Sequence, residues 1–497
     1  MQSSPTTSAV YCSVIVIVMS LAACCGAETV DFNRDIRPIL SNNCFQCHGP
    51  DSHHREADLR LDDESAAKEY AIVPGDLESE LITRITSTDA DTIMPPPDSA
   101  KSLDERQIAL LKQWVADGAA WSQHWAYERP VRHEVPSLEV AAGDAARTSR
   151  MKTHWIDAFI AQRLDREGLT FSQPTDDVTL IRRLHFDLTG LPPGPDEIRR
   201  ELEMLKTAGG YEAVVDSLLD SPHFGERMAV YWLDLVRYAD TVGYHGDQDQ
   251  NISPYRDYVI DAFNRNLPFD QFTREQLAGD LLPNPTIDQK IATGYNRMLQ
   301  TSHEGGVQPQ EYLAIYQADR VRNLSAVWLG ATLGCAQCHD HKYDPYTSKD
   351  FYSMAAFFAD VDEAQHFRKG TNSLPTARPP ELEVLNRADR ERLQFLKDKI
   401  EELTRAGGDD ELVAEFTAEK KQLEANRRKV MITVALETPR TIRVLPRGNY
   451  LDESGPIVEP AIPEFLGKLD TSERSSRLDL ADWLVDDDAG VGLLTAR

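Results

Sequence analysis

Cysteine is nearly absent from this 497-residue sequence outside two short motifs. Of the seven cysteines, Cys12, Cys24 and Cys25 lie near the N-terminus, and the other four belong to two copies of the pattern C-x-x-C-H. A disulfide framework of the kind that holds many small exported domains together is therefore excluded. The four remaining cysteines must serve the motifs in which they occur.

Basic charge is also in short supply. The sequence has 53 Lys and Arg residues against 81 Asp and Glu residues, which gives a formal net charge of −28. A surface of this sign repels nucleic acid and anionic lipid. We therefore expect no nucleic-acid partner, and no membrane contact apart from an N-terminal anchor or lipid.

Long hydrophobic runs are lacking except for one near the N-terminus, from Val10 to Ala23. This run is short for a membrane span and is typical of a signal peptide. We predict a signal peptide over residues 1–27, and hence export to the periplasm or cell envelope. The preceding Leu-Ala-Ala makes Cys24 a candidate lipoprotein cysteine. No Lys or Arg precedes the run, so an uncleaved anchor stays an alternative.

The first C-x-x-C-H motif is formed by Cys44, Cys47 and His48. Covalent haem c needs two thiols that bond to one porphyrin and a histidine that ligates its iron, and the motif supplies all three. A redox dithiol does not need the histidine, and it normally follows a β-strand at the start of a helix. We predict haem, with Met94 as the second axial ligand, because three prolines hold the loop after it. His53 and His54 are the alternative ligands, but they follow closely behind His48.

Two predicted helices flank the first motif. Apolar residues from Phe32 to Leu40 recur at helical spacing just before it. A capping box from Ser102 to Glu105 predicts the start of a second helix, and Gly118 predicts its end. A small cytochrome c domain needs such a pair of helices.

The second motif consists of Cys335, Cys338 and His339. We predict a second haem here. The two motifs lie nearly 300 residues apart, far beyond the spacing of about 15–20 residues in a zinc ribbon. A zinc ion held locally by this motif and His341 remains an alternative.

The second axial ligand of this second haem is not evident from the sequence. His341 is too close along the chain to reach the opposite face, and His303 and His245 are weak candidates. An open coordination position would permit reactions of bound ligands. Asp340, His341 and Tyr343 would then be candidate proton donors, unless they only stabilise a turn.

The rest of the chain predicts a mainly α protein. Helical patterns run from His154 to Phe358, a helical hairpin is expected over 387–429, and two or three strands follow over 429–448. The expected organisation is a signal peptide (1–27), a small cytochrome c domain (28–125), a linker (126–153), a larger helical domain with the second motif (154–362), a segment with the hairpin insertion and short β elements (363–460), and a C-terminal segment (461–497).

Several stretches together resemble a known domain pair. "DFNRDIRPILSNNCFQCHGPD", "IMPPP" and "LLKQWVADGAAW" resemble the planctomycete-type cytochrome c domain. "LIRRLHFDLTGLPP", "YWLDLVRYADTVGYHGD" and "VWLGATLGCAQCHDHKYDP" resemble the cytochrome-like domain that accompanies it. The final "LADWLVDDDAGVGLLTAR" resembles the truncated opening of a third, planctomycete-specific domain.

The resemblance implies a haem at the first motif, with Met94 matching the Met-Pro-Pro of the family, and a role for the second motif. It implies no particular reaction. We therefore expect an exported c-type cytochrome with two haems that exchanges electrons with a partner protein or a small-molecule donor or acceptor. The alternatives are a monohaem binding or scaffold protein with a structural zinc at the second motif, or a haem-dependent oxidoreductase.

Overall fold

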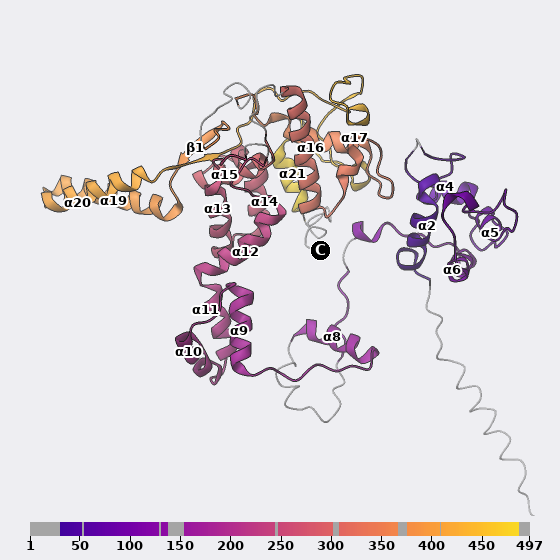
Figure 1. Ribbon diagram of the computed structural model, residues 1–497, viewed down its shortest axis with the longest axis horizontal. Helices are drawn as coiled ribbons and strands as arrows, with labels where there is room; N and C mark the ends of the chain where they lie inside the picture. The colour runs from indigo at the N-terminus through magenta and orange to yellow at the C-terminus, as the bar shows by residue number, and fades with distance from the viewer. Residues whose placement is uncertain are drawn as a thin grey trace, which may run out of the picture. The chain divides into compact units, whose positions relative to one another are not determined.

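The computed structural model describes residues 30–51, 54–128, 131–137, 154–243, 247–301, 308–365, 375–407 and 409–486. These residues are mostly helical, with two small antiparallel sheets in the described ranges, which confirms the mainly α prediction (Figure 1). The chain divides into two compact units. Residues up to Glu128 form the first together with Asp340–Pro345, and the remaining residues form the second.

The first unit is a set of short helices around one apolar core. Its elements are the π-helical turn η1 (Phe32–Ile36), α2 (Arg37–Asn43), α3 (Phe45–His48), α4 (Glu64–Tyr70), α5 (Glu80–Ile85), η2 (Pro97–Ser99), α6 (Glu105–Ala116) and η3 (Trp125–Tyr127). Ile36, Leu40 and Trp114 are buried in this core, together with Phe45 from within the first motif. The apolar spacing before the motif therefore predicted the helical turns η1 and α2 correctly.

The predicted start of the second flanking helix was wrong. Helix α6 begins at Glu105, and its capping box joins Asp104 and Gln107: the backbone NH of Gln107 donates to Asp104 Oδ1 at 2.8 Å, and that of Asp104 donates to Gln107 Oε1 at 3.0 Å. The sequence holds two overlapping cap patterns, and the later one prevails because both of its reciprocal bonds form. The helix ends two residues before Gly118, whose φ is +101°, as a terminating glycine predicts.

The second unit is a larger helical assembly. Its helices before the hairpin are α8 (Trp155–Arg166), α9 (Asp177–Leu188), α10 (Pro195–Leu205), α11 (Gly210–Leu219), α12 (Pro222–Leu235), α13 (Ser253–Asn264), α14 (Phe269–Ala278), η4 (Gly279–Leu281), α15 (Ile287–Ala292), η5 (Thr293–Arg297), α16 (Pro309–Trp328), η6 (Leu333–Gln337), α17 (Ser348–Ala356) and η7 (Phe357–Asp360). Helix α12 packs along α13, and α16 packs against η6 and α17. The second motif therefore lies where α16 and α17 meet. Within the ranges given above, no helix combines the length and the apolar composition that crossing a lipid bilayer requires.

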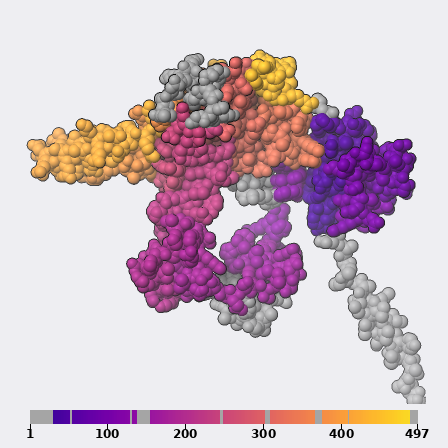
Figure 2. All heavy atoms as spheres, in the orientation of Figure 1, coloured from indigo at the N-terminus to yellow at the C-terminus, as the bar shows by residue number. Residues whose placement is uncertain are grey.

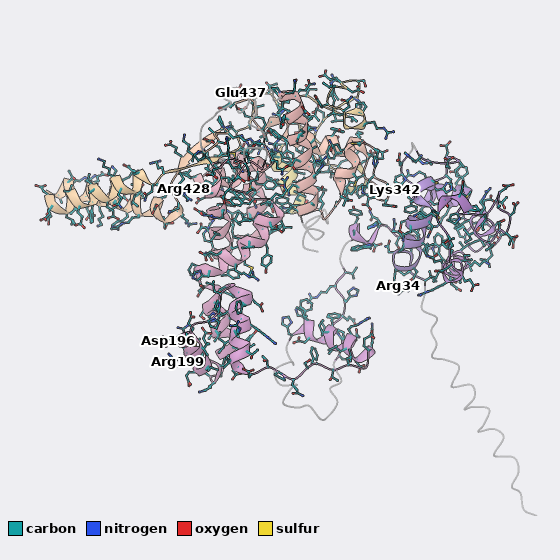
Figure 3. All side chains as sticks on the ribbon, in the orientation of Figure 1. Arg34, Asp196, Arg199, Lys342, Arg428 and Glu437 are labelled. Atoms are coloured by element: carbon teal, nitrogen blue, oxygen red, sulfur yellow. The ribbon has the colours of Figure 1, made fainter. Side chains whose placement is uncertain are left out.

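The predicted helical hairpin is confirmed. Helices α19 (Arg387–Ala406) and α20 (Asp410–Ala425) pack against each other and project from the second unit (Figures 1 and 2). Strands β1 (Glu381–Val384) and β2 (Arg428–Met431) pair antiparallel at its base. Arg428, labelled in Figure 3, lies at this base. It forms an ion pair with Asp257 of α13.

The strand prediction after the hairpin is confirmed in part. β2 and β3 (Ile442–Arg443) lie in the predicted stretch, and β3 pairs with β4 (Ile457–Val458). Sequence reasoning missed β1, because this isolated strand forms only by pairing with β2 on the far side of the helical hairpin. The last elements are η8 (Pro446–Gly448), η9 (Glu464–Leu466) and α21 (Arg477–Leu484).

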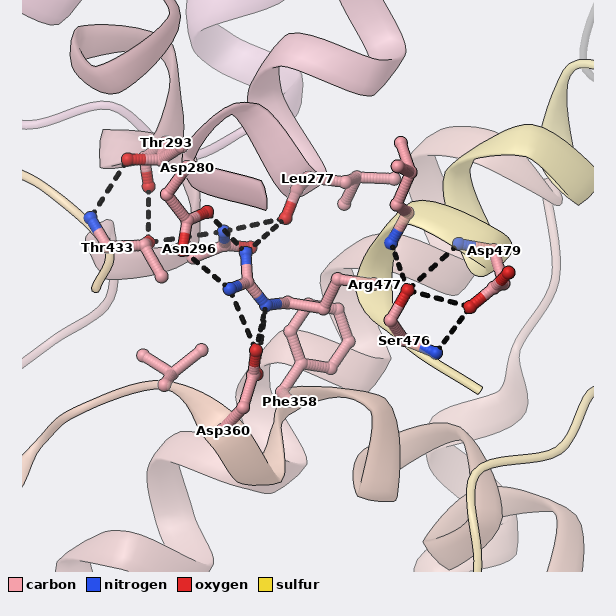
Figure 4. A network of polar contacts seen from close by, with 12 residues as sticks. Leu277, Asp280, Thr293, Asn296, Phe358, Asp360, Thr433, Ser476, Arg477 and Asp479 are labelled. Carbon is pink, nitrogen blue, oxygen red and sulfur yellow. Dashed lines mark hydrogen bonds and ion pairs between the residues drawn. The ribbon is translucent and has the colours of Figure 1, made fainter. Parts of the chain in front are cut away.

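The C-terminal helix α21 belongs to the core of the second unit. It packs against α14, and the buried Arg477 donates to Asp280 Oδ2 at 2.8 Å and to Asp360 Oδ2 at 2.9 Å (Figure 4). Arg477 also donates to the carbonyl oxygen of Leu277 at 2.7 Å. One guanidinium thus joins α21 to the ends of α14, η4 and η7.

Candidate haem sites

The first motif occupies a single helical turn. Cys44 ends α2, and its carbonyl oxygen accepts hydrogen bonds from the backbone NH groups of Cys47 at 3.1 Å and His48 at 2.8 Å. Phe45 points into the apolar core, whereas Cys44 is half-buried, Cys47 is exposed and His48 is half-buried. The core therefore fixes the turn through Phe45. The two thiols and the imidazole remain available to bind a single ligand.

His48 has an unused ring nitrogen. Its Nδ1 is buried and has no hydrogen-bond partner among the described residues. Burial lowers the pKa of His48, although the nearby backbone of Glu56 acts in the opposite direction. The neutral imidazole is the form that binds metal ions. His48 therefore fits the role of an iron ligand.

The thiols fit thioether attachment better than dithiol chemistry. Cys44 and Cys47 are both free. Burial, and then the proximity of Cys47, raises the pKa of Cys44 to about 12. Redox-active dithiols depend on a lowered thiol pKa. The raised pKa of Cys44 therefore argues against a redox-active dithiol at this motif. Attachment of a haem by the two thiols, with His48 as iron ligand, is consistent with the groups present.

The chain folds back over the motif directly after it. The backbone NH of Glu56 donates to the carbonyl oxygen of Cys47, and that of Leu61 to the carbonyl oxygen of His48, both at 2.8 Å. The reversal requires Gly49, because a Cβ at this position would lie 2.3 Å from the carbonyl oxygen of Phe45. The loop from 49 to 61 is thereby tied to the backbone of the motif.

Met94 lies on a loop that is tied to α5. Its backbone NH donates to the carbonyl oxygen of Arg84 at 3.1 Å, and its side chain is half-buried. Besides burial, the charge of Arg84 also lowers the pKa of His48. Axial ligation by Met94 stays a prediction.

The second motif is built differently. Cys335 lies in η6 and Cys338 at its end, and both thiols are free and exposed. Leu333 and Ala336 hold η6 against the core with no exposed surface. The half-buried His339 follows directly, so the two thiols and the imidazole again come from one short segment.

Three distant residues support this second motif, and sequence reasoning missed all of them. Tyr352 of α17 donates from its hydroxyl to the carbonyl oxygen of Gln337 at 3.0 Å, and Arg322 of α16 contacts the Gln337 side chain. Gly448 lies so close that a Cβ there would approach Cys338 Sγ to 2.9 Å. The Pro446–Gly448 sequence signals a turn, but nothing in it indicates which segment the turn touches.

The residues after the second motif form a turn. The buried His341 accepts through Nδ1 from the backbone NH groups of Tyr343 at 3.2 Å and Asp344 at 2.9 Å. His341 therefore has the turn-stabilising role that was one of the two interpretations of this segment.

The structure does not assemble the alternative zinc site. Across the described ranges, no three His, Cys, Asp or Glu side chains converge so as to hold a metal ion. Cys335, Cys338, His339 and His341 thus form no tetrahedral cluster. The other candidate ligands, His245 and His303, lie outside the described residues, as do the predicted signal peptide and Cys24.

Comparison with known families agrees with the domain order expected from the sequence. Residues 44–98 match the family described as Planctomycete cytochrome C, a range that includes the first motif and Met94. Residues 155–363 match a family described as Protein of unknown function (DUF1549), a range that includes the second motif. No curated protein and no solved structure matches the chain. The first match indicates a cytochrome c domain and haem c binding, and neither match defines a reaction.

Proposed function

We propose that this chain is an exported c-type cytochrome that binds two haems and transfers electrons. The observation that carries the proposal is the first motif: two free thiols and a histidine with an unused, buried nitrogen occupy one turn, inside a segment that matches a cytochrome c family. Dithiol redox chemistry does not need the histidine, whereas covalent haem attachment requires all three groups together.

At the first site, Cys44 and Cys47 would attach the haem and His48 would ligate its iron. A haem held there supplies a one-electron redox couple. The protein's part is to hold it: Phe45 anchors the turn in the core, and the backbone NH groups of Glu56 and Leu61 bond to the carbonyl oxygens of Cys47 and His48. Met94 would complete the ligand set from its loop near α5.

The second haem is proposed at Cys335, Cys338 and His339. Two observations support it: both thiols are free and exposed, and Gly448 allows the chain to pass close to Cys338, where a Cβ would lie 2.9 Å from its Sγ. Among the described residues, no three His, Cys, Asp or Glu side chains converge at this motif, so the proposal here is haem in preference to zinc. His245 and His303 stay the candidate distal ligands of this second haem.

The partner we propose is a redox protein or a small molecule that donates or accepts electrons. A net charge of −28 favours a basic or neutral protein partner, because long-range attraction steers encounter between opposite charges. The same charge disfavours nucleic acid. We also propose export to the periplasm or cell envelope, on the basis of the predicted signal peptide. Lipid attachment at Cys24 is the alternative to cleavage after Ala27.

The test is the haem content of three proteins made in a host that matures c-type cytochromes. Intact-mass measurement should show two added haems on the wild-type chain. Each of two double variants should carry one haem: Cys44→Ala with Cys47→Ala, and Cys335→Ala with Cys338→Ala. Each double variant is thus the control for the other. A bare polypeptide mass for the wild-type chain would refute the proposal. One iron and one zinc per chain would reduce it to a monohaem protein with structural zinc.

A further inference from the structure

Four oxidisable aromatic rings form a continuous series through the second unit. Tyr238 stacks on Tyr255 of α13 with ring centroids 6.4 Å apart, and the hydroxyl of Tyr255 accepts from Trp232 Nε1 of α12 at 3.2 Å. Trp232 in turn meets Trp328 of α16 edge to face, with centroids 5.4 Å apart. The three helices that carry these contacts, α12, α13 and α16, are labelled in Figure 1.

The two ends of the series differ in their surroundings. Trp328 is fully buried and closes α16, seven residues before Cys335, and α16 packs against η6. Tyr238 is half-buried, and its hydroxyl donates to the exposed Asp240 at 2.5 Å. The series thus runs from the helix beside the second motif to a surface tyrosine that has a carboxylate for its proton.

We propose that Trp328, Trp232, Tyr255 and Tyr238 form a route for one-electron oxidation between the second motif and the surface. This rests on the proposed haem at that motif. With a peroxide as the co-reactant that oxidises a haem at the motif, Trp328 loses one electron toward the motif, and the electron vacancy passes along the rings to Tyr238. Tyr238 then loses its electron inward and its phenolic proton to Asp240, which leaves a neutral tyrosyl radical and a protonated carboxyl. An external one-electron donor then reduces the radical, and the proton returns from Asp240 to the phenolate oxygen, which restores both groups.

Packing alone does not account for the polar atoms in this series. A phenylalanine would fill the space at position 255 equally well. The hydroxyl of Tyr255 nevertheless donates to Gln276 Oε1 at 2.5 Å, and Trp232 Nε1 donates to the same oxygen at 3.0 Å. Phenylalanine rings are not oxidised under conditions that oxidise tyrosine or tryptophan. Tyrosine oxidation also requires a base for the proton, and Asp240 supplies one at the surface end.

The experiment places a photo-oxidant where the haem would be. In the mature chain with Cys44, Cys47 and Cys338 changed to serine, a ruthenium polypyridyl label is attached to Cys335. Tyr343→Phe and Tyr352→Phe are added, because these two tyrosines adjoin the motif and would be oxidised directly. A light flash with a cobalt(III) ammine acceptor generates ruthenium(III), and electron paramagnetic resonance of rapidly frozen samples detects tyrosyl radicals.

We expect a radical signal that Tyr238→Phe and Trp328→Phe each remove, and that forms more slowly in Asp240→Asn. Tyr312→Phe, which alters a tyrosine of α16 outside the series, should leave it unchanged. A signal that survives Trp328→Phe or Tyr238→Phe, in variants whose circular dichroism is unaltered, overturns the route, as does the absence of any signal. Since the label replaces the haem, this result is independent of the haem content of the wild-type chain.

Discussion

The buried carboxylate of Glu363 gives the sharpest stability prediction. Glu363 is fully buried and faces three buried arginines: it pairs with Arg320, lies 3.2 Å from Arg378 and lies 3.7 Å from Arg297. Burial lowers the pKa of Arg297 to about 10, and Glu363 is the first group that opposes this change. Glu363 thus supplies the main negative charge that compensates this buried cluster of positive charges, and Asp362 adds to it at Arg297. Glu363→Gln keeps the shape of the side chain and removes that charge.

The expected loss is large because the arginines stay behind. Removing one partner of a buried ion pair costs about 3–5 kcal/mol, since the other charge is left buried without compensation. Here three guanidiniums are affected, although backbone carbonyl oxygens still accept from each of them; Arg297, for example, donates to Ile432 at 2.9 Å. We therefore expect Glu363→Gln to destabilise the second unit by about 3–5 kcal/mol at neutral pH.

The pH dependence follows from the direction of the pKa shift. Burial by itself would raise the pKa of Glu363, but Arg378, Arg297 and Arg320 outweigh it and hold the pKa well below its ordinary value. A carboxyl with a depressed pKa contributes stability that is fully present above its unfolded pKa, about 4.3, and is lost as the pH falls further. The difference between wild type and Glu363→Gln should therefore be constant near neutral pH and shrink below about pH 4.

The assay is denaturant unfolding of the whole chain, followed by tryptophan fluorescence and by hydrogen exchange of peptides from α16. Exchange isolates the second unit, since a chain with two compact units need not unfold in one step. Glu419→Gln is the matched control: this partly exposed carboxylate pairs with Arg392 on the hairpin, and its loss should not change exchange in α16. Equal effects of the two variants, or a difference that persists at acid pH, would refute the reasoning.

Three further predictions concern the motifs and the C-terminal helix. Met94→Ala should abolish the sulfur-to-iron charge-transfer absorption of the ferric protein and lower the reduction potential, because a thioether favours Fe(II); an unchanged spectrum would make Met94 a loop residue only. Gly448→Ala, at a φ of +72° and against Cys338, should cost about 1–2 kcal/mol and reduce haem uptake at the second motif alone, as intact mass will show. Arg477→Leu leaves two aspartates unpaired and should cost about 3–5 kcal/mol in the same exchange assay; protection equal to wild type in α14 would contradict this.

Periodic patterns predicted the helices well, since they depend on neighbouring residues. The apolar spacing before the first motif, the helical hairpin and the glycine after α6 all correspond to observed features. Local patterns failed where two solutions compete or where the element is short. The two overlapping cap patterns before α6 differ only in which pair of reciprocal hydrogen bonds forms. Strand β1 forms only because it pairs with β2, which lies on the other side of the hairpin in the sequence.

The residue types at both sites could be predicted from the sequence, but their supports could not. Cys44, Cys47 and His48 are recognisable because the chemistry of haem attachment fixes their spacing. The orphaned nitrogen of His48 and the raised pKa of Cys44 depend on which atoms the fold buries, so no pattern reveals them. The buried arginines around Glu363 resemble ordinary surface charges in the sequence.

The two motifs differ in how far apart in the sequence the residues lie that hold each of them in place. The turn at Cys44 is held by α2, by Phe45 and by a loop that ends at Leu61, all within about thirty residues of one another. The segment at Cys338 is held by Arg322, Tyr352 and Gly448, which span more than a hundred residues and can assemble only when the second unit folds. Closing longer loops costs more conformational entropy. Destabilising the second unit, for example through Glu363, should therefore impair the second motif while the first keeps its turn.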